Sequence, residues 1–194
     1  MMCALQLGQR MLDPGRNVMV QILIILAPIL VLAAATDICY HKIPNWLTFP
    51  AIIAGIIYHS FTAGIQGCLL SVAGVLLGMA FFLPFYLKGG TGAGDVKLMG
   101  AVGGFLGPVG VFYAFLFSSI AGGIYAVLLL LRHGLFKETF MRYWYMLSMF
   151  LVQHTMLYIP PRDEAGMPVL RFGVSIAVGT ISFVLADLIW ILNP

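Results

Sequence analysis

Charged residues are scarce in this sequence. Only 9% of its 194 residues are Asp, Glu, Lys or Arg, whereas 61% are hydrophobic, and the mean hydropathy is +1.02. A soluble domain typically carries about 25% charged residues, so this chain lacks the polar surface that a water-soluble globule needs. Intrinsic disorder is excluded too, because it requires low hydrophobicity and high net charge. The composition therefore indicates an integral membrane protein.

Cysteine is equally scarce, and the basic residues are dispersed. Cys3, Cys39 and Cys68 lie far apart, with no CxxC pair and no Cys/His cluster at zinc spacing. The sequence thus indicates neither a disulfide framework nor a metal site. Ten Lys and Arg residues give a net charge of +3 but form no basic stripe, so nucleic acid is not an expected partner.

Long apolar runs make up most of the chain. A helix that crosses a hydrocarbon core about 30 Å thick needs about 20 residues. A proline at position 108 divides the longest run, because proline disfavours helical geometry in the residue before it. We therefore expect an all-α, polytopic membrane protein with about six transmembrane helices in a single membrane-embedded domain, residues 1–194. The expected spans are 18–36, 46–63, 68–87, 95–106, 109–131 and 169–192.

The segment 139–159 differs from these runs. It is rich in Met and aromatic residues, and Gln153 and His154 interrupt its apolar character. Such a composition suits a helix that lies in the membrane interface better than one that spans the bilayer. We expect an interfacial helix along the cytoplasmic leaflet.

The basic residues orient the expected spans. If the chain starts outside, eight of the ten basic residues fall in cytoplasmic loops or at the cytoplasmic ends of spans, and only Arg10 and Arg16 do not. The two turns on the other face carry no charge. This distribution agrees with the positive-inside rule.

Two aspartates stand out, because ionisable residues at the bilayer are costly unless a partner or water compensates them. Asp37 closes the first expected span, and Asp95 opens the fourth directly after residues 92–94, Gly-Ala-Gly. The apolar runs and the basic residues, without the aspartates, give a topology that places both aspartates at the cytoplasmic face. We therefore expect that the two carboxyl groups can meet.

A close pair of carboxyl groups can perform aspartic protease chemistry. Such a pair holds one proton, so one member acts as a base towards water while the other polarises a carbonyl. This chemistry needs no metal, no cofactor and no covalent intermediate. From the residues alone, two other interpretations stay open: carboxylates that couple ion transport, and a structural cap at a helix N-terminus.

Residues around the aspartates are secondary candidates for substrate binding or gating. Gly92 and Gly94 permit positive φ and close approach of a substrate backbone, in a loop that could act as an entry gate. Lys97 is a candidate for pairing with the aspartates or binding a substrate carbonyl, although it serves equally well as a topology anchor. Asn45 is expected to cap the second helix. Glycines at GxxxG spacing, at positions 74 and 78 and at 100 and 104, predict close helix packing.

The two aspartate motifs resemble those of the type IV prepilin peptidase family of G-x-G-D intramembrane aspartic proteases. The resemblance rests on Asp37 with the downstream Ile43-Pro44-Asn45, on residues 92–98, and on residues 171–179, which are similar to the family's last span. It implies that Asp37 and Asp95 are the catalytic pair. It also implies a multi-pass protein of the cell inner membrane that cleaves a basic leader at the cytoplasmic face. The implied substrate and partner is a type IV pilin-like precursor, which belongs to pilus assembly and secretion.

One departure narrows the resemblance. Larger members carry a cytoplasmic insertion with paired CxxC motifs and methylate the new pilin N-terminus, but this chain has neither the insertion nor the cysteine pairs. It is similar to the short, peptidase-only members, such as those that serve tight-adherence pili, and methyltransferase activity is not expected. The alternatives are a small proton- or ion-coupled transporter that uses the same carboxylates, and a non-catalytic pilus assembly factor.

Overall fold

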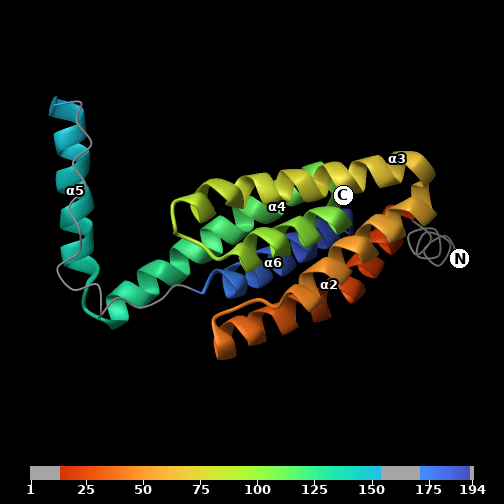
Figure 1. The fold of residues 1–194 in the computed structure, drawn as a ribbon, viewed down its shortest axis with the longest axis horizontal. Coiled ribbons are helices and arrows are strands. Elements are labelled where there is room, and N and C mark those ends of the chain that lie inside the picture. The colour runs from red at the N-terminus through yellow and green to blue at the C-terminus, as the bar shows by residue number, and fades with distance from the viewer. Residues whose placement is uncertain (1–13, 154–170, 193–194) are drawn as a thin grey trace, which may run out of the picture. The chain divides into compact units, whose positions relative to one another are not determined.

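The computed structural model describes residues 14–153 and 171–192, which are helical apart from short connections and contain no strand. This confirms the all-α class. The helices, labelled in Figure 1, are α2 (Pro14–Tyr40), α3 (Asn45–Leu87), α4 (Ala93–Arg132), α5 (Phe136–Gln153) and α6 (Phe172–Leu192). Of these, α2, α3, α4 and α6 are long and apolar enough to cross a membrane.

The two longest helices, α3 and α4, each contain a kink with non-helical backbone. In α3 the kink lies at Ala63 and Gly64, where Gly64 has φ 61°, and in α4 it lies at Gly107, with φ 70°. Such positive φ angles favour glycine, which has no Cβ. The kinks coincide with the expected breaks between spans two and three and between spans four and five. The number of about six spans nevertheless stays a prediction.

The chain reverses direction at both kinks (Figure 1). Gly74 faces Gly103, and Gly78 faces Met99, so the second half of α3 runs antiparallel to the first half of α4. The same Gly78 also approaches Val111 beyond the α4 kink. Each kinked helix therefore forms a hairpin, and small residues line the contact between the two hairpins, as the glycine spacing predicts.

The chain forms two compact units. Within the described residues, unit 1 comprises 14–122 and 171–192, and unit 2 comprises 123–153. Unit 1 contains both candidate aspartates. In unit 2, the rings of Phe136, Phe140 and Trp144 follow one another at four-residue spacing along α5 and stack in pairs. The single-domain organisation and the interfacial position of this helix stay predictions.

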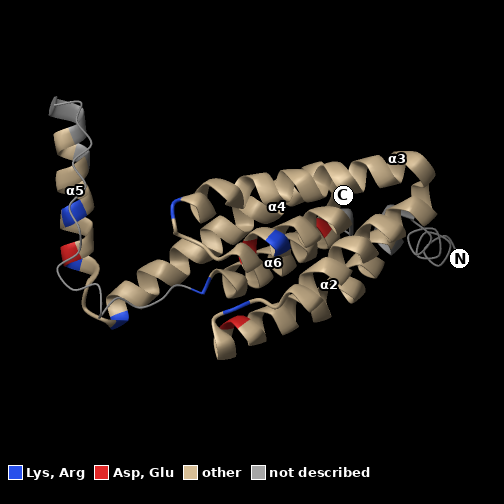
Figure 2. Cartoon of the chain, viewed as in Figure 1, with Lys and Arg blue, Asp and Glu red and all other residues tan. Residues whose placement is uncertain are grey.

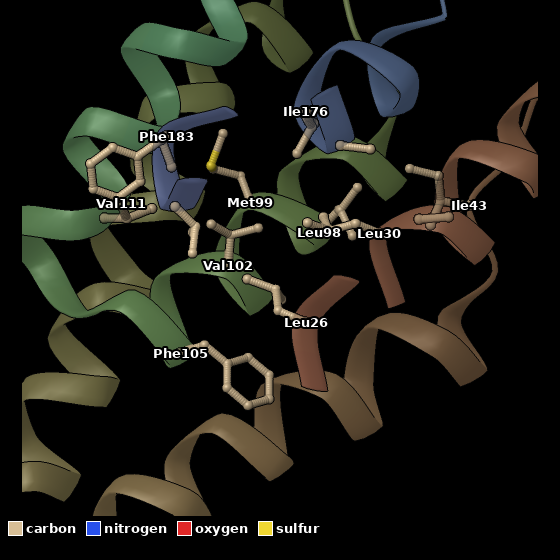
Figure 3. Close-up of a cluster of buried hydrophobic side chains, with 14 of the residues drawn as sticks. Leu26, Leu30, Ile43, Leu98, Met99, Val102, Phe105, Val111, Ile176 and Phe183 are labelled. Carbon is tan, nitrogen blue, oxygen red and sulfur yellow. The ribbon is translucent and has the colours of Figure 1, made fainter. Parts of the chain in front are cut away.

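The core of unit 1 lies between α2, α4 and α6 (Figure 3). Leu26 and Leu30 of α2 and Leu98 and Val102 of α4 are almost completely buried, as is Ile176 of α6. The outward side chains are also apolar, with many Leu, Ile and Phe residues exposed along α2, α3 and α4. An apolar exterior around an apolar core suits a lipid environment rather than water.

Two helices extend beyond the expected segments. The helix that contains the first expected span continues past Thr36 to Tyr40, so the aspartate in its last turn does not stop it. The α5 helix begins at Phe136, ahead of the expected segment that starts at 139. The span limits themselves stay predictions. Residues 154–159 of the expected interfacial segment and 169–170 of the last span lie outside the described residues.

Candidate functional site

Charged residues of unit 1 lie mostly towards one end of the helices (Figure 2). This end contains the connection from α2 to α3, the connection from α3 to α4 and the start of α6. The opposite end contains the two glycine kinks. The uneven distribution agrees with the expected charged and uncharged faces.

Asp37 lies in the last turn of α2 and is buried, with 7% of its surface exposed. Its Oδ2 accepts a hydrogen bond of 2.9 Å from the backbone N–H of Gly173, in the first turn of α6. Positive charge near this carboxylate comes from the N-terminal end of that helix and from Arg171, whose charge acts on it. Asp37 therefore connects the end of one helix to the beginning of another.

The chain turns sharply after Asp37. His41 has φ 55°, and its N–H donates to the carbonyl oxygen of Asp37 at 3.0 Å, which is the geometry of a left-handed helix C-cap. The side chain of His41 lies beside Arg171, with 3.2 Å between His41 Nε2 and the guanidinium. This turn directs the connection back across the end of the bundle.

Asp95 lies in the first turn of α4 and is also buried, with 8% exposed. Its Oδ2 accepts a hydrogen bond of 3.0 Å from the N–H of Gly92, while its own N–H donates to the Gly92 carbonyl at 3.1 Å. The first of these bonds is the side-chain half of a capping box, in which an acidic residue in the first turn accepts from the N-cap N–H; the second is a backbone turn bond, because glycine has no side chain to complete the box. The cap interpretation and the catalytic interpretation of Asp95 are therefore compatible, because the cap occupies one oxygen of the carboxyl group.

The two carboxyl groups are close enough for the charge of Asp37 to act on Asp95. Ile43, in the connection between α2 and α3, contacts both neighbourhoods. A Cβ atom at Gly94 would lie 2.9 Å from Ile43 Cβ, and one at Gly173 would lie 3.0 Å from Ile43 Cδ1. The structure thus brings the two aspartates together from α2 and α4. The start of α6 bonds Asp37, and Ile43 packs against Gly173 and Gly94.

The candidate gating glycines have different local roles in the structure. Of the four glycines between 89 and 94, only Gly89 has a positive φ, 74°. Gly92 provides the N–H that bonds Asp95, and Gly94 packs against Ile43. Substrate binding or gating by Gly92 and Gly94 stays a prediction.

Lys97 contacts the beginning of α3. Its Nζ donates to Asn45 Oδ1 at 2.8 Å and lies 5.0 Å from the centre of the Phe49 ring. The expected cap by Asn45 was wrong. The N-cap position of α3 is Pro44, whose side chain makes no hydrogen bond to the helix. The Asn45 side chain accepts a hydrogen bond from Lys97 instead. This contact ties the motif after Asp37 to the motif around Asp95.

A double-mutant cycle tests this tie. We expect Lys97→Met and Asn45→Ala each to lower the free energy of unfolding by about 1 kcal/mol, because one charge-assisted but partly exposed hydrogen bond is lost. The double variant is expected to cost little more than either single variant. Thermal unfolding in detergent micelles measures these values. Fully additive losses would show that the two side chains do not interact, and a higher KM for Lys97→Met alone would indicate that Lys97 acts on the substrate.

Three contributors were missed by the sequence reasoning: Gly173, Ile43 and the Asn45 side chain as a partner of Lys97. The motif at 171–179 pointed to the segment that contains Gly173. No pattern in a single sequence, however, reveals which helix end a buried carboxylate will contact. Among the described residues, no group of three or more His, Cys, Asp or Glu side chains has the arrangement of a metal site.

The comparison with family models gave one match. The model of the type IV leader peptidase family matches residues 24–127, just over half of the chain, and this range includes both Asp37 and Asp95. No curated protein and no solved structure gave a match.

Proposed function

The chain belongs to the type IV leader peptidase family, and from this premise we propose that it is an intramembrane aspartic endopeptidase. Its substrate is a type IV prepilin or pilin-like precursor, from which it removes the basic leader. The observation that carries the proposal is a pair of buried carboxyl groups, Asp37 and Asp95, supplied by two helices at one end of the bundle.

The proposed reaction uses one proton shared by the pair. One carboxylate removes a proton from water, and the oxygen of that water attacks the scissile carbonyl while the protonated partner gives its proton to the carbonyl oxygen. In the second step, the carboxyl group that gained a proton from water passes it to the leaving nitrogen. The C–N bond breaks, and the other aspartate recovers a proton from the tetrahedral intermediate. Leader acid and pilin amine leave, and the pair again holds one proton.

The surrounding structure supports this chemistry. Backbone N–H groups of Gly173 and Gly92 hold one oxygen of each carboxyl group, which limits their rotation before the substrate arrives. The outward apolar surface of the helices suits a precursor whose own apolar helix lies in the bilayer. Its leader, carrying basic residues, would remain on the cytoplasmic side of the inner membrane, beside the charged end of unit 1.

Cleavage of a synthetic precursor by the reconstituted protein tests the proposal. We expect a single cut at the boundary between a basic leader ending in Gly and the apolar helix, and mass spectrometry of both products identifies it. A metal chelator should leave the rate unchanged, because the proposed steps use carboxyl groups and water. The pilin product should retain an unmethylated N-terminus, since the chain has no paired CxxC motif.

Two outcomes would contradict the proposal. Loss of cleavage in chelator, restored by added divalent metal, would indicate metal-dependent hydrolysis. Absence of cleavage together with proton flux in the same vesicles would favour an ion-coupled transporter.

A further inference from the structure

Gly173, Ile43 and Gly94 form a continuous contact across the site. Ile43 is buried, with 8% exposed, and its side chain lies against Gly173 through Cδ1 and against Gly94 through Cβ. Gly173 also contacts Asp37, and Gly94 immediately precedes Asp95. The contact therefore runs from the surroundings of one carboxyl group to those of the other.

A side chain at either glycine would displace a neighbour. A Cβ atom at Gly173 would lie 2.8 Å from Asp37 Oδ2 and 3.0 Å from Ile43 Cδ1. A Cβ atom at Gly94 would lie 2.9 Å from Ile43 Cβ and 3.2 Å from the Ile43 carbonyl oxygen. In a close-packed interior, even one added carbon displaces its neighbours. Here the nearest neighbours include the carboxylate itself.

We propose that Gly173, Ile43 and Gly94 are positioning residues that together set the separation and orientation of Asp37 and Asp95. This inference rests on the proposed function of the pair. Ile43 acts as a spacer whose width separates the start of α6 from the start of α4. The Gly173 N–H fixes the rotation of the Asp37 carboxylate, and the missing Cβ atoms let both helix starts approach the spacer.

The first test is Gly173→Ala. The new methyl group would be caught between Asp37 and Ile43, so the carboxylate is displaced, and a displacement of about 1 Å at a catalytic group can lower a rate by about 10²-fold. We expect kcat for precursor cleavage to fall by about that factor with KM unchanged, because the surface that binds the precursor is not altered. A fall in kcat of less than twofold in a folded variant would overturn the inference.

A second-site variant gives a sharper test. Ile43→Val removes Cδ1 but retains Cβ, so it frees space for the methyl of Gly173→Ala and none for that of Gly94→Ala. We expect Ile43→Val to restore kcat of Gly173→Ala to within about 10-fold of the wild type and to leave Gly94→Ala impaired. Equal rescue of both variants, or of neither, would contradict the spacer geometry.

Controls separate this inference from general effects on folding. Gly122→Ala is the matched variant, because its Cβ would meet Ser175 and Phe172 of α6 at ordinary distances of 3.5 and 3.8 Å, and it should keep the wild-type kcat. If Gly173→Ala does not accumulate, Ile43→Val alone tests the inference. The smaller side chain no longer fills the space between the starts of α6 and α4, so the two carboxyl groups are held less precisely and kcat should fall severalfold. A wild-type kcat in Ile43→Val would then overturn the inference. Failure of the wild-type protein to cleave any precursor would instead refute the proposed function.

Discussion

Asp37→Asn and Asp95→Asn are each expected to abolish leader cleavage while the protein level stays unchanged. Neither asparagine can exchange the proton that the reaction requires, and loss of general acid–base catalysis costs on the order of 10²–10⁴-fold in rate. The Asn side chain still offers an oxygen to the N–H of Gly173 or of Gly92, so the helix contacts are retained. Cleavage of a pilin-like precursor in membranes, followed by gel shift and mass spectrometry, measures the effect.

The same pair of variants separates catalysis from capping. If Asp95 served only to bond the Gly92 N–H, Asn would replace it with little loss, since its side-chain oxygen can accept the same hydrogen bond. The double variant should be no less active than either single variant, because the two carboxyl groups act as one unit. Asp187→Asn, a partly buried aspartate near the other end of α6, is the control and should retain full activity. Retained cleavage in either Asp37→Asn or Asp95→Asn would remove that residue from the catalytic pair.

Gly103→Ala is expected to have the largest effect on stability. A Cβ atom at Gly103 would overlap the backbone carbonyl of Gly74, and one at Gly74 would overlap the carbonyl of Gly103. Because backbone atoms cannot rotate aside, the two hairpins would have to separate. Overpacking of this kind costs about 1–3 kcal/mol or more, so we expect a lower thermal midpoint in detergent and less folded protein in membranes.

The control for this prediction is Gly123→Ala, a helical position in α4 with nothing within 4 Å of its added Cβ. Alanine in a helix interior is more favourable than glycine by about 0.5–1 kcal/mol, so this variant should be as stable as the wild type or more so. An unchanged midpoint for Gly103→Ala would show that the hairpins do not pack as closely as the structure indicates.

Much of the fold is readable from local features of the sequence. The apolar runs predicted the helices, because lipid requires backbone groups to bond within each spanning segment. Pro108 and the gap between the expected spans 46–63 and 68–87 marked the kinks, and the structure places Gly64 and Gly107 there with the positive φ that the reversals need. The end of α2 was harder to place, since Asp37 in a last helical turn is polar in sequence yet buried by a helix more than a hundred residues later.

The sequence by itself predicted that this protein is helical and largely apolar, as its described residues are, and that Asp37 and Asp95 belong to the same end of its helices. Composition and the positions of charge suffice for that, because the energetic cost of charge in a bilayer acts on each segment separately. Only the tertiary structure decided what holds the two carboxyl groups. The start of α6 bonds Asp37, the Gly92 N–H orients Asp95, and Ile43 lies between two glycines at which an added Cβ atom would displace a neighbour. These contacts depend on the close packing of distant segments, which no local pattern encodes.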